Sequence, residues 1–130
     1  MRLLLDTHAF LWSASEPERL SKAARAAIED SRNDVFVSAA VALEISIKHA
    51  LGKLSLPGEP AVYVPARIAS LGFKPLAITV EHALAVRALP NHHSDPFDRM
   101  MIAQSQVEGL TFVANDDAAQ KYAVHTLSAG

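Results

Sequence analysis

The 130-residue sequence contains no cysteine. Disulfide bonds and thiolate metal sites are therefore excluded, and a reducing cytosol is compatible with this composition. Long apolar runs are also missing, because no stretch approaches the ~20 residues that a membrane-spanning helix needs. The apolar start MRLLLDTHAFLW reaches an acid after only three leucines, and it lacks the long apolar segment and cleavage site of a signal peptide. We therefore predict a soluble cytoplasmic protein that does not associate with a membrane.

A surplus of charge of one sign is absent as well. Twelve Lys and Arg residues stand against fourteen Asp and Glu residues, which gives a formal net charge of −2. This balance argues against binding of nucleic acid through bulk positive charge, but it does not exclude a local basic groove. The motifs HExxH, GxGxxG, GxSxG and the phosphate-binding loop are also missing, so the common zinc-protease, dinucleotide, hydrolase and P-loop sites are unsupported.

The residues that are present favour one folded domain. Half of them are hydrophobic, which is enough to bury a core in a chain of this length, and we predict a single domain over residues 1–130. Strands are expected at 2–5, 34–38, 73–78, 111–115 and 124–128, and helices at 7–14, 22–31, 39–54, 61–71, 80–89, 96–108 and 116–122. Pro75 indicates that the third strand lies at an edge of the sheet. Alternation of short strands with helices predicts an α/β fold with a mostly parallel sheet.

Acidic residues follow the predicted strands at the places where such folds bind ligands, beyond the carboxyl ends of the strands. Asp6 directly follows the first strand, and Asp116 follows the fourth. Glu44 lies about two turns into the helix after the second strand, and Asp95 and Asp98 open the helix that leads into the fourth. We expect these side chains to converge on one rim of the sheet.

Carboxylates that converge repel one another, and they cannot all remain ionised without a compensating cation. Hard oxygen ligands in a chain without cysteine favour Mg²⁺ or Mn²⁺. Such an ion lowers the pKa of bound water and stabilises charge on a phosphate during in-line attack. The acids therefore predict a metal-dependent site that cleaves phosphodiester bonds.

Several of these acids also have a purely structural explanation. Asp95 is a good helix N-cap before Pro96, and taken alone this explanation is favoured for Asp95. For Asp98, at the third helical position, a capping-box-like role and a metal role are equally supported. Glu44 has Lys48 four residues further on, so the helix alone favours a surface ion pair.

The three remaining acids differ in how easily a structural role explains them. Asp116 and its neighbour Asp117 are each able to cap the short helix that follows. Asp6 resists such an explanation, because a charge that ends a buried strand of leucines carries a desolvation cost unless it has a partner.

The six histidines are assigned to structural or surface roles. His92 and His93 precede the acids of the 96–108 helix, but adjacent side chains rarely point at one ion, and a loop surface is expected for both. The other four, which share no spacing, are His8, His49, His82 and His125.

Four segments in order, LLLDTHAFLW, SAAVALEISIKHALGKL, HHSDPFDRMMIAQSQVEG and TFVANDDAAQKY, resemble the PIN-domain ribonucleases. The likeness is greatest to the VapC-type toxins of bacterial and archaeal toxin–antitoxin pairs, and it extends over nearly the whole chain. LLLDTH and DPFDR…IAQ are its specific parts, whereas residues 55–90 contribute little. The resemblance implies a three-layer α/β/α sandwich, Rossmann-like, with a central mostly parallel sheet. It also implies a Mg²⁺- or Mn²⁺-dependent endoribonuclease that hydrolyses RNA, usually a homodimer, inhibited by a cognate antitoxin.

Carried over residue by residue, the resemblance implies four metal-binding and catalytic acids: Asp6, Glu44, Asp98 and Asp116. It gives supporting roles to Asp95, to Thr7 after the first acid, and to Arg99, which would position a carboxylate or a phosphate. Relatives usually carry Thr or Ser two residues before the fourth acid, where this chain has Ala114, so a hydroxyl that orients the metal shell is missing. Asp117 is a lower-ranked alternative to Asp116.

The expected partners are RNA and an antitoxin. RNA would meet scattered basic residues near the acids, namely Lys48, Arg99 and Lys53. The antitoxin would insert an arginine into the acidic pocket, or lay an amphipathic helix against the apolar side of the 39–54 helix.

Two rival functions remain: a PIN-like scaffold that binds RNA or protein without cutting, and a receiver-like phospho-acceptor. The receiver would need paired acids after the first strand and a lysine after the last, and the sequence has neither.

Overall fold

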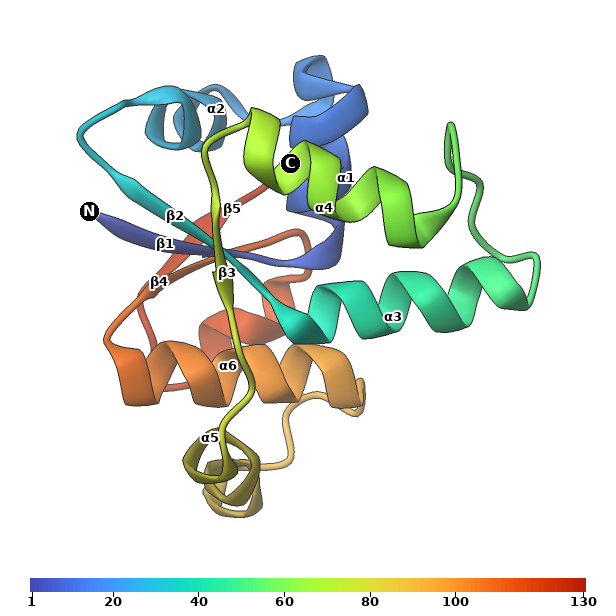
Figure 1. Ribbon diagram of the computed structural model, residues 1–130. Coiled ribbons are helices and arrows are strands. Elements are labelled where there is room, and N and C mark those ends of the chain that lie inside the picture. Colours follow the sequence, from blue (N-terminus) through green and yellow to red (C-terminus); the bar gives the residue numbers. More distant parts are fainter.

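Five short strands form one parallel sheet in the computed structural model, which describes residues 1–130 (Figure 1). The strands are β1 (Arg2–Leu5), β2 (Asp34–Ser38), β3 (Lys74–Leu76), β4 (Thr111–Ala114) and β5 (Thr126–Ser128). Their order across the sheet is β3-β2-β1-β4-β5, and every neighbouring pair is parallel. The predicted α/β class is confirmed, and β3 with its Pro75 is an edge strand, as expected.

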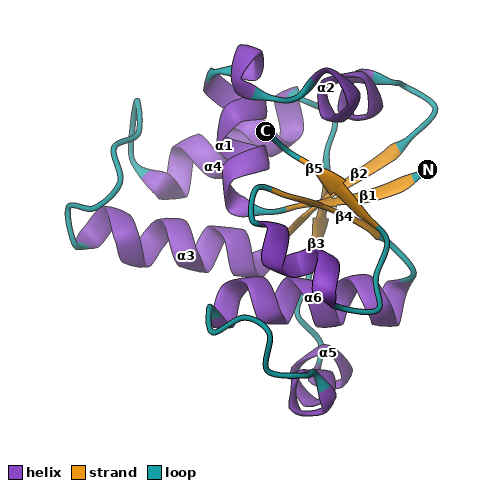
Figure 2. Cartoon of the chain, turned by 180° about the vertical axis from the view of Figure 1, so that it is seen from behind, coloured by secondary structure: helices purple, strands orange, loops and turns teal.

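Helices cover both faces of this sheet and give it three layers (Figures 1 and 2). They are α1 (Thr7–Ser15), α2 (Lys22–Glu29), α3 (Ala39–Ala50), α4 (Pro60–Ser70), α5 (Val80–Ala85) and α6 (Pro96–Glu108), with short 3₁₀ helices η1 (Pro17–Arg19), η2 (Val86–Ala88) and η3 (Asp117–Lys121). In Figure 1, α1, α2 and α4 lie above the sheet and α5 and α6 below it. Helix α3 leaves the carboxyl end of β2 and extends between α4 and α6.

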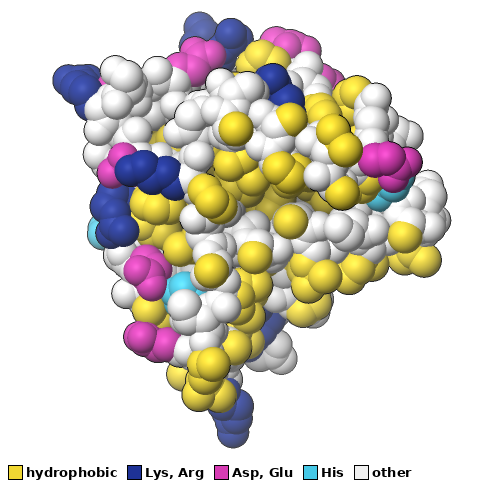
Figure 3. Space-filling view, viewed as in Figure 1, with side chains coloured by type: hydrophobic (Ala, Val, Ile, Leu, Met, Phe, Trp, Pro, Cys, Tyr) yellow, Lys and Arg dark blue, Asp and Glu magenta, His cyan; other side chains and the backbone are white.

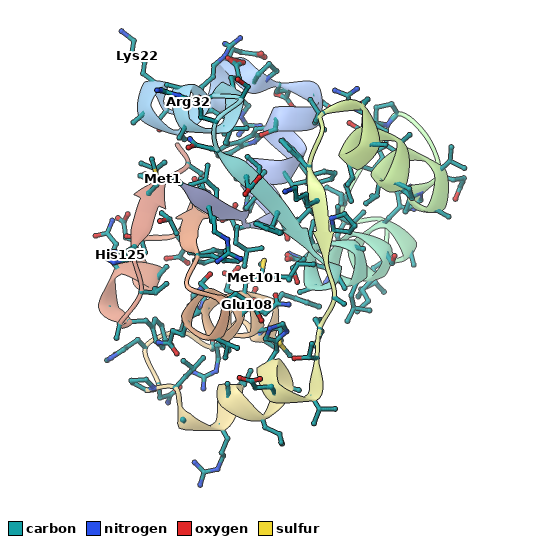
Figure 4. The ribbon with its side chains drawn as sticks, turned by 60° about the vertical axis from the view of Figure 1, so that its left-hand side comes forward. Met1, Lys22, Arg32, Met101, Glu108 and His125 are labelled. Atoms are coloured by element: carbon teal, nitrogen blue, oxygen red, sulfur yellow. The ribbon has the colours of Figure 1, made fainter.

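The core follows from the continuous apolar character of the central strand. Leu3, Leu4 and Leu5 of β1 are all fully buried, because β1 has a strand on each side and helices on both faces. From below, α6 packs on the sheet and buries Met101, which points from the helix toward the strands (Figure 4). None of the helices combines the length and apolar character that crossing a membrane would require.

Several elements are shorter than the sequence pattern predicts. Helix α3 ends at Ala50 and not at residue 54, because the chain turns at Gly52, which has a φ of 71°. The helix expected over 80–89 becomes a 3₁₀ helix after Ala85. The segment predicted as a helix over 116–122 is likewise a five-residue 3₁₀ helix. Periodicity shows where an element lies, but its end depends on turns and tertiary packing.

The carboxyl ends of the three central strands share one edge of the sheet. There the chain passes from β1 into α1, from β2 into α3, and from β4 into η3. Each helix begins with a side chain that accepts a backbone hydrogen bond: Asp6 from Ala9, Ser38 from Ala40, and Asp116 from Ala118. This edge therefore collects helix starts, with their positive dipole ends and their polar caps.

Candidate metal centre

A polar cavity of about 180 Å³ opens at this edge of the sheet. Its lining residues come from α1, α3, the start of α6 and the end of β4, and they are Asp6, Thr7, His8, Glu44, Lys48, His93, Asp95, Asp98, Asn115 and Asp116. The structure thus brings the four predicted acids into one hollow, together with Thr7 and Asp95. Arg99, Asp117 and Lys53 are not part of its lining.

Asp6 forms the floor of the cavity and is only 4% exposed. One of its carboxylate oxygens accepts the Ala9 N–H at 2.7 Å, and the other accepts the Asn115 N–H at 2.7 Å. The side chain therefore caps α1 and also ties the end of β1 to the end of β4. Burial raises the pKa of Asp6 above its usual value, against the lowering effect of these two hydrogen bonds.

Glu44 is 5% exposed, and both of its oxygens have partners. Oε1 accepts the hydroxyl of Thr7 at 2.6 Å, and Oε2 forms an ion pair with Lys48. The same contact raises the pKa of Lys48. The ion pair that the helix pattern suggested therefore exists, but its acid is buried at the cavity and does not lie on the surface.

Asp95 and Asp98 differ in what their side chains do: Asp95 caps the helix, and Asp98 faces the cavity. Oδ1 of Asp95 accepts the backbone N–H groups of Phe97 and Asp98 at 2.8 and 3.0 Å, so Asp95 is the N-cap of α6. Asp98 makes no capping hydrogen bond and lines the cavity. Burial, followed by repulsion from Asp95 and Asp6, raises the pKa of Asp98 to about 7. A carboxyl held in this way gains most from a nearby cation.

His93 also lines the cavity, although we expected it to lie on a loop surface. Its Nε2 is 2.8 Å from Oδ2 of Asp98 and 3.3 Å from Oδ2 of Asp116. His92, the adjacent residue, turns away and packs its ring edge-on against Tyr122. The two adjacent rings point in different directions, in line with the expectation that adjacent side chains rarely point at one ion, but assigning His93 to the loop surface was wrong. The only sequence signal was its place two residues before the capping Asp95.

Arg99 does not contact a carboxylate, which is one of the two partners that the resemblance implied for it. Its guanidinium donates to the carbonyls of Val86, Leu89, Pro90 and His93 and to the Tyr122 hydroxyl, at 2.8 to 3.4 Å. The four carbonyls lie on η2 and on the loop between η2 and α6, so in this structure Arg99 holds the loop that carries His93. It contacts no carboxylate of the cavity.

At the end of β4, the structure distinguishes the two adjacent acids. Asp116 caps η3 through Oδ1 and turns Oδ2 toward His93, whereas Asp117 is exposed and is not part of the cavity lining. Ala114 is buried at the end of the strand and offers no hydroxyl. In this region of the structure, the backbone N–H of Asn115 donates to the carboxylate of Asp6 and orients it.

A larger cavity of about 430 Å³ lies at the opposite edge, by the amino ends of β2 and β3. Its two aspartates are already paired, Asp30 with Arg32 at 2.8 Å and Asp34 with Lys74 at 2.9 Å. These pairs lower the pKa of both acids. Size alone favours this hollow, but its acids are neutralised by the chain itself, so the smaller cavity is the candidate for a cation.

The donor set of the smaller cavity fits a hard divalent ion. Carboxylate oxygens predominate, and one ligand atom each from His93, Asp98 and Asp116 lie within 4.8 Å of one another. Burial first, and then repulsion from the neighbouring acids, raises the pKa of Asp98, and Lys48, the lysine in the lining, is paired with Glu44. Octahedral coordination by few protein oxygens and several waters is what Mg²⁺ prefers, and Mn²⁺ also suits oxygen ligands.

The chain belongs to the PIN domain family, whose model matches residues 3–124. The family expected from the sequence motifs is therefore confirmed. A stretch of 64 residues is 44% identical to Ribonuclease VapC16 of Mycobacterium tuberculosis, and it covers 49% of this chain and 45% of that relative.

Solved structures support the same fold at much lower identity. VapBC2 from Rickettsia felis, bound to a promoter DNA fragment, has a TM-score of 0.73 at 11% identity and full coverage of both chains. DNA-bound VapBC from Salmonella typhimurium has a TM-score of 0.67 at 14% identity, with 98% of this chain and 97% of that chain covered. At these identities the likeness establishes the arrangement of helices and strands.

Proposed function

We propose that this protein is a Mg²⁺- or Mn²⁺-dependent endoribonuclease that hydrolyses RNA phosphodiester bonds as the toxin of a toxin–antitoxin pair. One observation carries most of the weight: Asp6, Glu44, Asp98 and Asp116, from four separate segments, line one cavity. The partial match to a ribonuclease of the VapC type supports the same activity. The catalytic domain spans residues 1–130.

In this proposal the four acids hold the ion, directly or through waters, and each is kept in place by the fold. Once bound, the ion lowers the pKa of a water and stabilises the charge that develops on the phosphate. Thr7 fixes the orientation of Glu44, and Lys48 balances its charge. Asp95 fixes the start of α6, and thereby the direction of Asp98. No side chain is required to act as a nucleophile.

RNA approaches a cavity that is itself negative, so recognition depends on cations at its rim. Lys48 is half-exposed beside Glu44, and Lys53 lies on the exposed turn after α3. Arg99 is occupied by backbone carbonyls and is left out of this surface. So few basic residues favour an RNA that is chosen by its shape over indiscriminate binding.

The partner surface that we propose for the antitoxin is an apolar stripe on α3. Leu43, Ile47 and Leu51 are spaced four residues apart and are 52%, 43% and 62% exposed. Figure 3 shows hydrophobic atoms along the edge of the molecule that α3 forms. An amphipathic segment would cover this stripe, and an arginine from it would bind the acids bidentately and exclude the metal. The structural neighbours VapBC2 and VapBC are both DNA-bound, the first to a fragment of its promoter. We further propose that the toxin is a cytoplasmic homodimer.

Cleavage of labelled RNA by the purified chain tests the enzymatic proposal. We expect cutting with Mn²⁺ or Mg²⁺ and none with EDTA. Asp116→Asn should abolish it, whereas Asp117→Asn, which changes the adjacent acid outside the cavity, should retain it. RNA binding without cutting in any metal would instead support the non-catalytic scaffold and overturn the proposal.

The toxin assignment has a separate test in cells. Induced expression should arrest growth, and co-expression of a small protein from the adjacent reading frame should relieve the arrest. Arrest that persists in Asp116→Asn would show that RNA cleavage is not its cause.

A further inference from the structure

We propose that His93 supplies a nitrogen ligand to the divalent ion, in addition to the four acids, and that it shifts the preference of the site from Mg²⁺ toward first-row transition ions. This inference rests on the metal-dependent function proposed above. It assigns a role to the one cavity residue whose imidazole lies between two of the acids.

The separations around Nε2 match those between ligands of one ion. Two ligands on adjacent corners of an octahedron with bonds of about 2.1 Å stand roughly 3 Å apart. Nε2 of His93 is 2.8 Å from Asp98 Oδ2 and 3.3 Å from Asp116 Oδ2, which brackets that value. Both separations are therefore compatible with ligands of one ion, and Nε2 already lies beside both oxygens.

The direction of the ring supports the same interpretation. Nε2 is buried and has no hydrogen-bond partner, although a carboxylate oxygen lies only 2.8 Å away. A ring nitrogen that donated to Asp98 or Asp116 would point along the line to one of them. A nitrogen close to both oxygens and aligned with neither points into the space that they share, as a metal ligand does.

The loop around His93 is held by the side chains of Arg99 and Tyr122, which contact its backbone. Arg99 of α6 donates to the carbonyls of Pro90 and His93, and the Tyr122 hydroxyl accepts the N–H of His92 at 3.1 Å. These bonds hold the loop on both sides of the imidazole. The ring is thus held at the acids by contacts that do not involve the ion.

The other ring nitrogen has to adapt when the ion binds. Nδ1 accepts the N–H of Asp95 at 3.2 Å, which places the proton of a neutral ring on Nε2. Coordination through Nε2 would require the proton to be on Nδ1, so the contact of Nδ1 with the Asp95 N–H would have to be lost.

An imidazole among carboxylates has a consequence for metal choice. Mg²⁺ is a hard ion that prefers oxygen and keeps its waters, whereas first-row ions gain more from nitrogen, in the order Mn²⁺ below Co²⁺. We therefore expect the site to bind Mn²⁺ and Co²⁺ more tightly than Mg²⁺. His93 accounts for a large part of that difference.

Pulsed electron paramagnetic resonance of Mn²⁺ bound to the full chain tests this directly. We expect ¹⁴N modulation from a coordinated imidazole in the wild type and in His92→Ala, the matched control whose ring faces Tyr122. His93→Ala should lose the modulation. Its Mn²⁺ affinity should fall by about tenfold or more, with a smaller change for Mg²⁺, while circular dichroism reports that the chain remains folded.

The other outcomes separate this inference from the function on which it rests. Mn²⁺ that binds the wild type without ¹⁴N modulation, or an unchanged ratio of Mn²⁺ to Mg²⁺ affinity in His93→Ala, would overturn the role of His93 and leave the nuclease intact. A wild-type chain that binds no Mn²⁺ at all would overturn both.

Discussion

Thr7 Oγ1 donates a 2.6 Å hydrogen bond to Oε1 of Glu44, 37 residues further along the chain. The hydroxyl follows the first acid directly, so the bond links the end of β1 to the third helix of the fold. Lys48 holds the other oxygen. Between them, these two partners place the second acid of the cavity without help from an ion.

Thr7→Val should therefore weaken metal binding while the fold persists. Valine keeps the shape of the side chain and removes the hydroxyl, so Glu44 loses one of its two partners. We expect Mn²⁺ affinity and cleavage rate to fall by about 10- to 100-fold, and the free energy of unfolding to fall by about 1–3 kcal/mol. Ser13→Ala, which removes another buried hydroxyl of α1, is the control for activity. Equal losses in both variants would argue against a specific role for Thr7.

Stability in the absence of metal should depend on pH through Asp98. The pKa of Asp98 is raised from 3.8 to about 7, so the folded chain holds this proton more tightly than the unfolded chain. The resulting stabilisation is fully present below pH 3.8 and is lost as the pH rises through 7. Unfolding by urea in the presence of EDTA measures this effect. As the pH rises from 5 to 8, the free energy of unfolding of Asp98→Asn should increase relative to that of the wild type by on the order of 2–4 kcal/mol. A constant difference would mean that Asp98 titrates normally.

The same proton competes with the ion. Because a carboxylate has to be deprotonated to bind a metal, the wild-type affinity for Mn²⁺ should rise roughly tenfold between pH 6 and pH 8 and then level off. Isothermal titration calorimetry at several pH values measures this. An affinity that does not change with pH over this range would contradict the raised pKa.

A buried amide on α6 links that helix to the start of α3. Gln104 is fully buried, accepts the Ser38 hydroxyl at 2.6 Å and donates to the carbonyl of Ala77 at 3.3 Å. Gln104→Leu should lower the free energy of unfolding by about 1–3 kcal/mol, because it leaves these buried polar groups without a partner. Gln106→Leu, on the exposed side of the same helix, should change it by less than about 0.5 kcal/mol. Comparable changes in the two variants would show that the hydrogen bonds of Gln104 do not contribute specifically to stability.

Much of this architecture could be predicted from local patterns. The leucines of β1 mark a strand buried on both faces, and an acid directly after them has few alternatives to a functional site. Asp95 before Pro96 identifies a helix start from chemistry confined to a few residues. The rule that parallel strands present their carboxyl ends at one edge then joins Asp6 to Asp116 before any coordinates are known.

The failures arise where position depends on distant contacts. His93 lies in a loop without periodicity, and its direction is set by hydrogen bonds from Arg99 and by the packing of its neighbour on Tyr122. The resemblance implied that Arg99 positions a carboxylate or a phosphate, yet carbonyls up to 13 residues earlier take its donors. Neither geometry is encoded in the spacing of nearby residues.

The proposal that the acids of the 180 Å³ cavity bind a divalent ion is tested most directly by anomalous scattering from crystals of the chain soaked in Mn²⁺, which locates the ion. We expect one or two peaks inside the cavity, about 2–2.5 Å from carboxylate oxygens of Asp98 and Asp116. Peaks confined to other acids, such as Asp30 or Asp34, would contradict it, as would a cavity without a peak at saturating Mn²⁺.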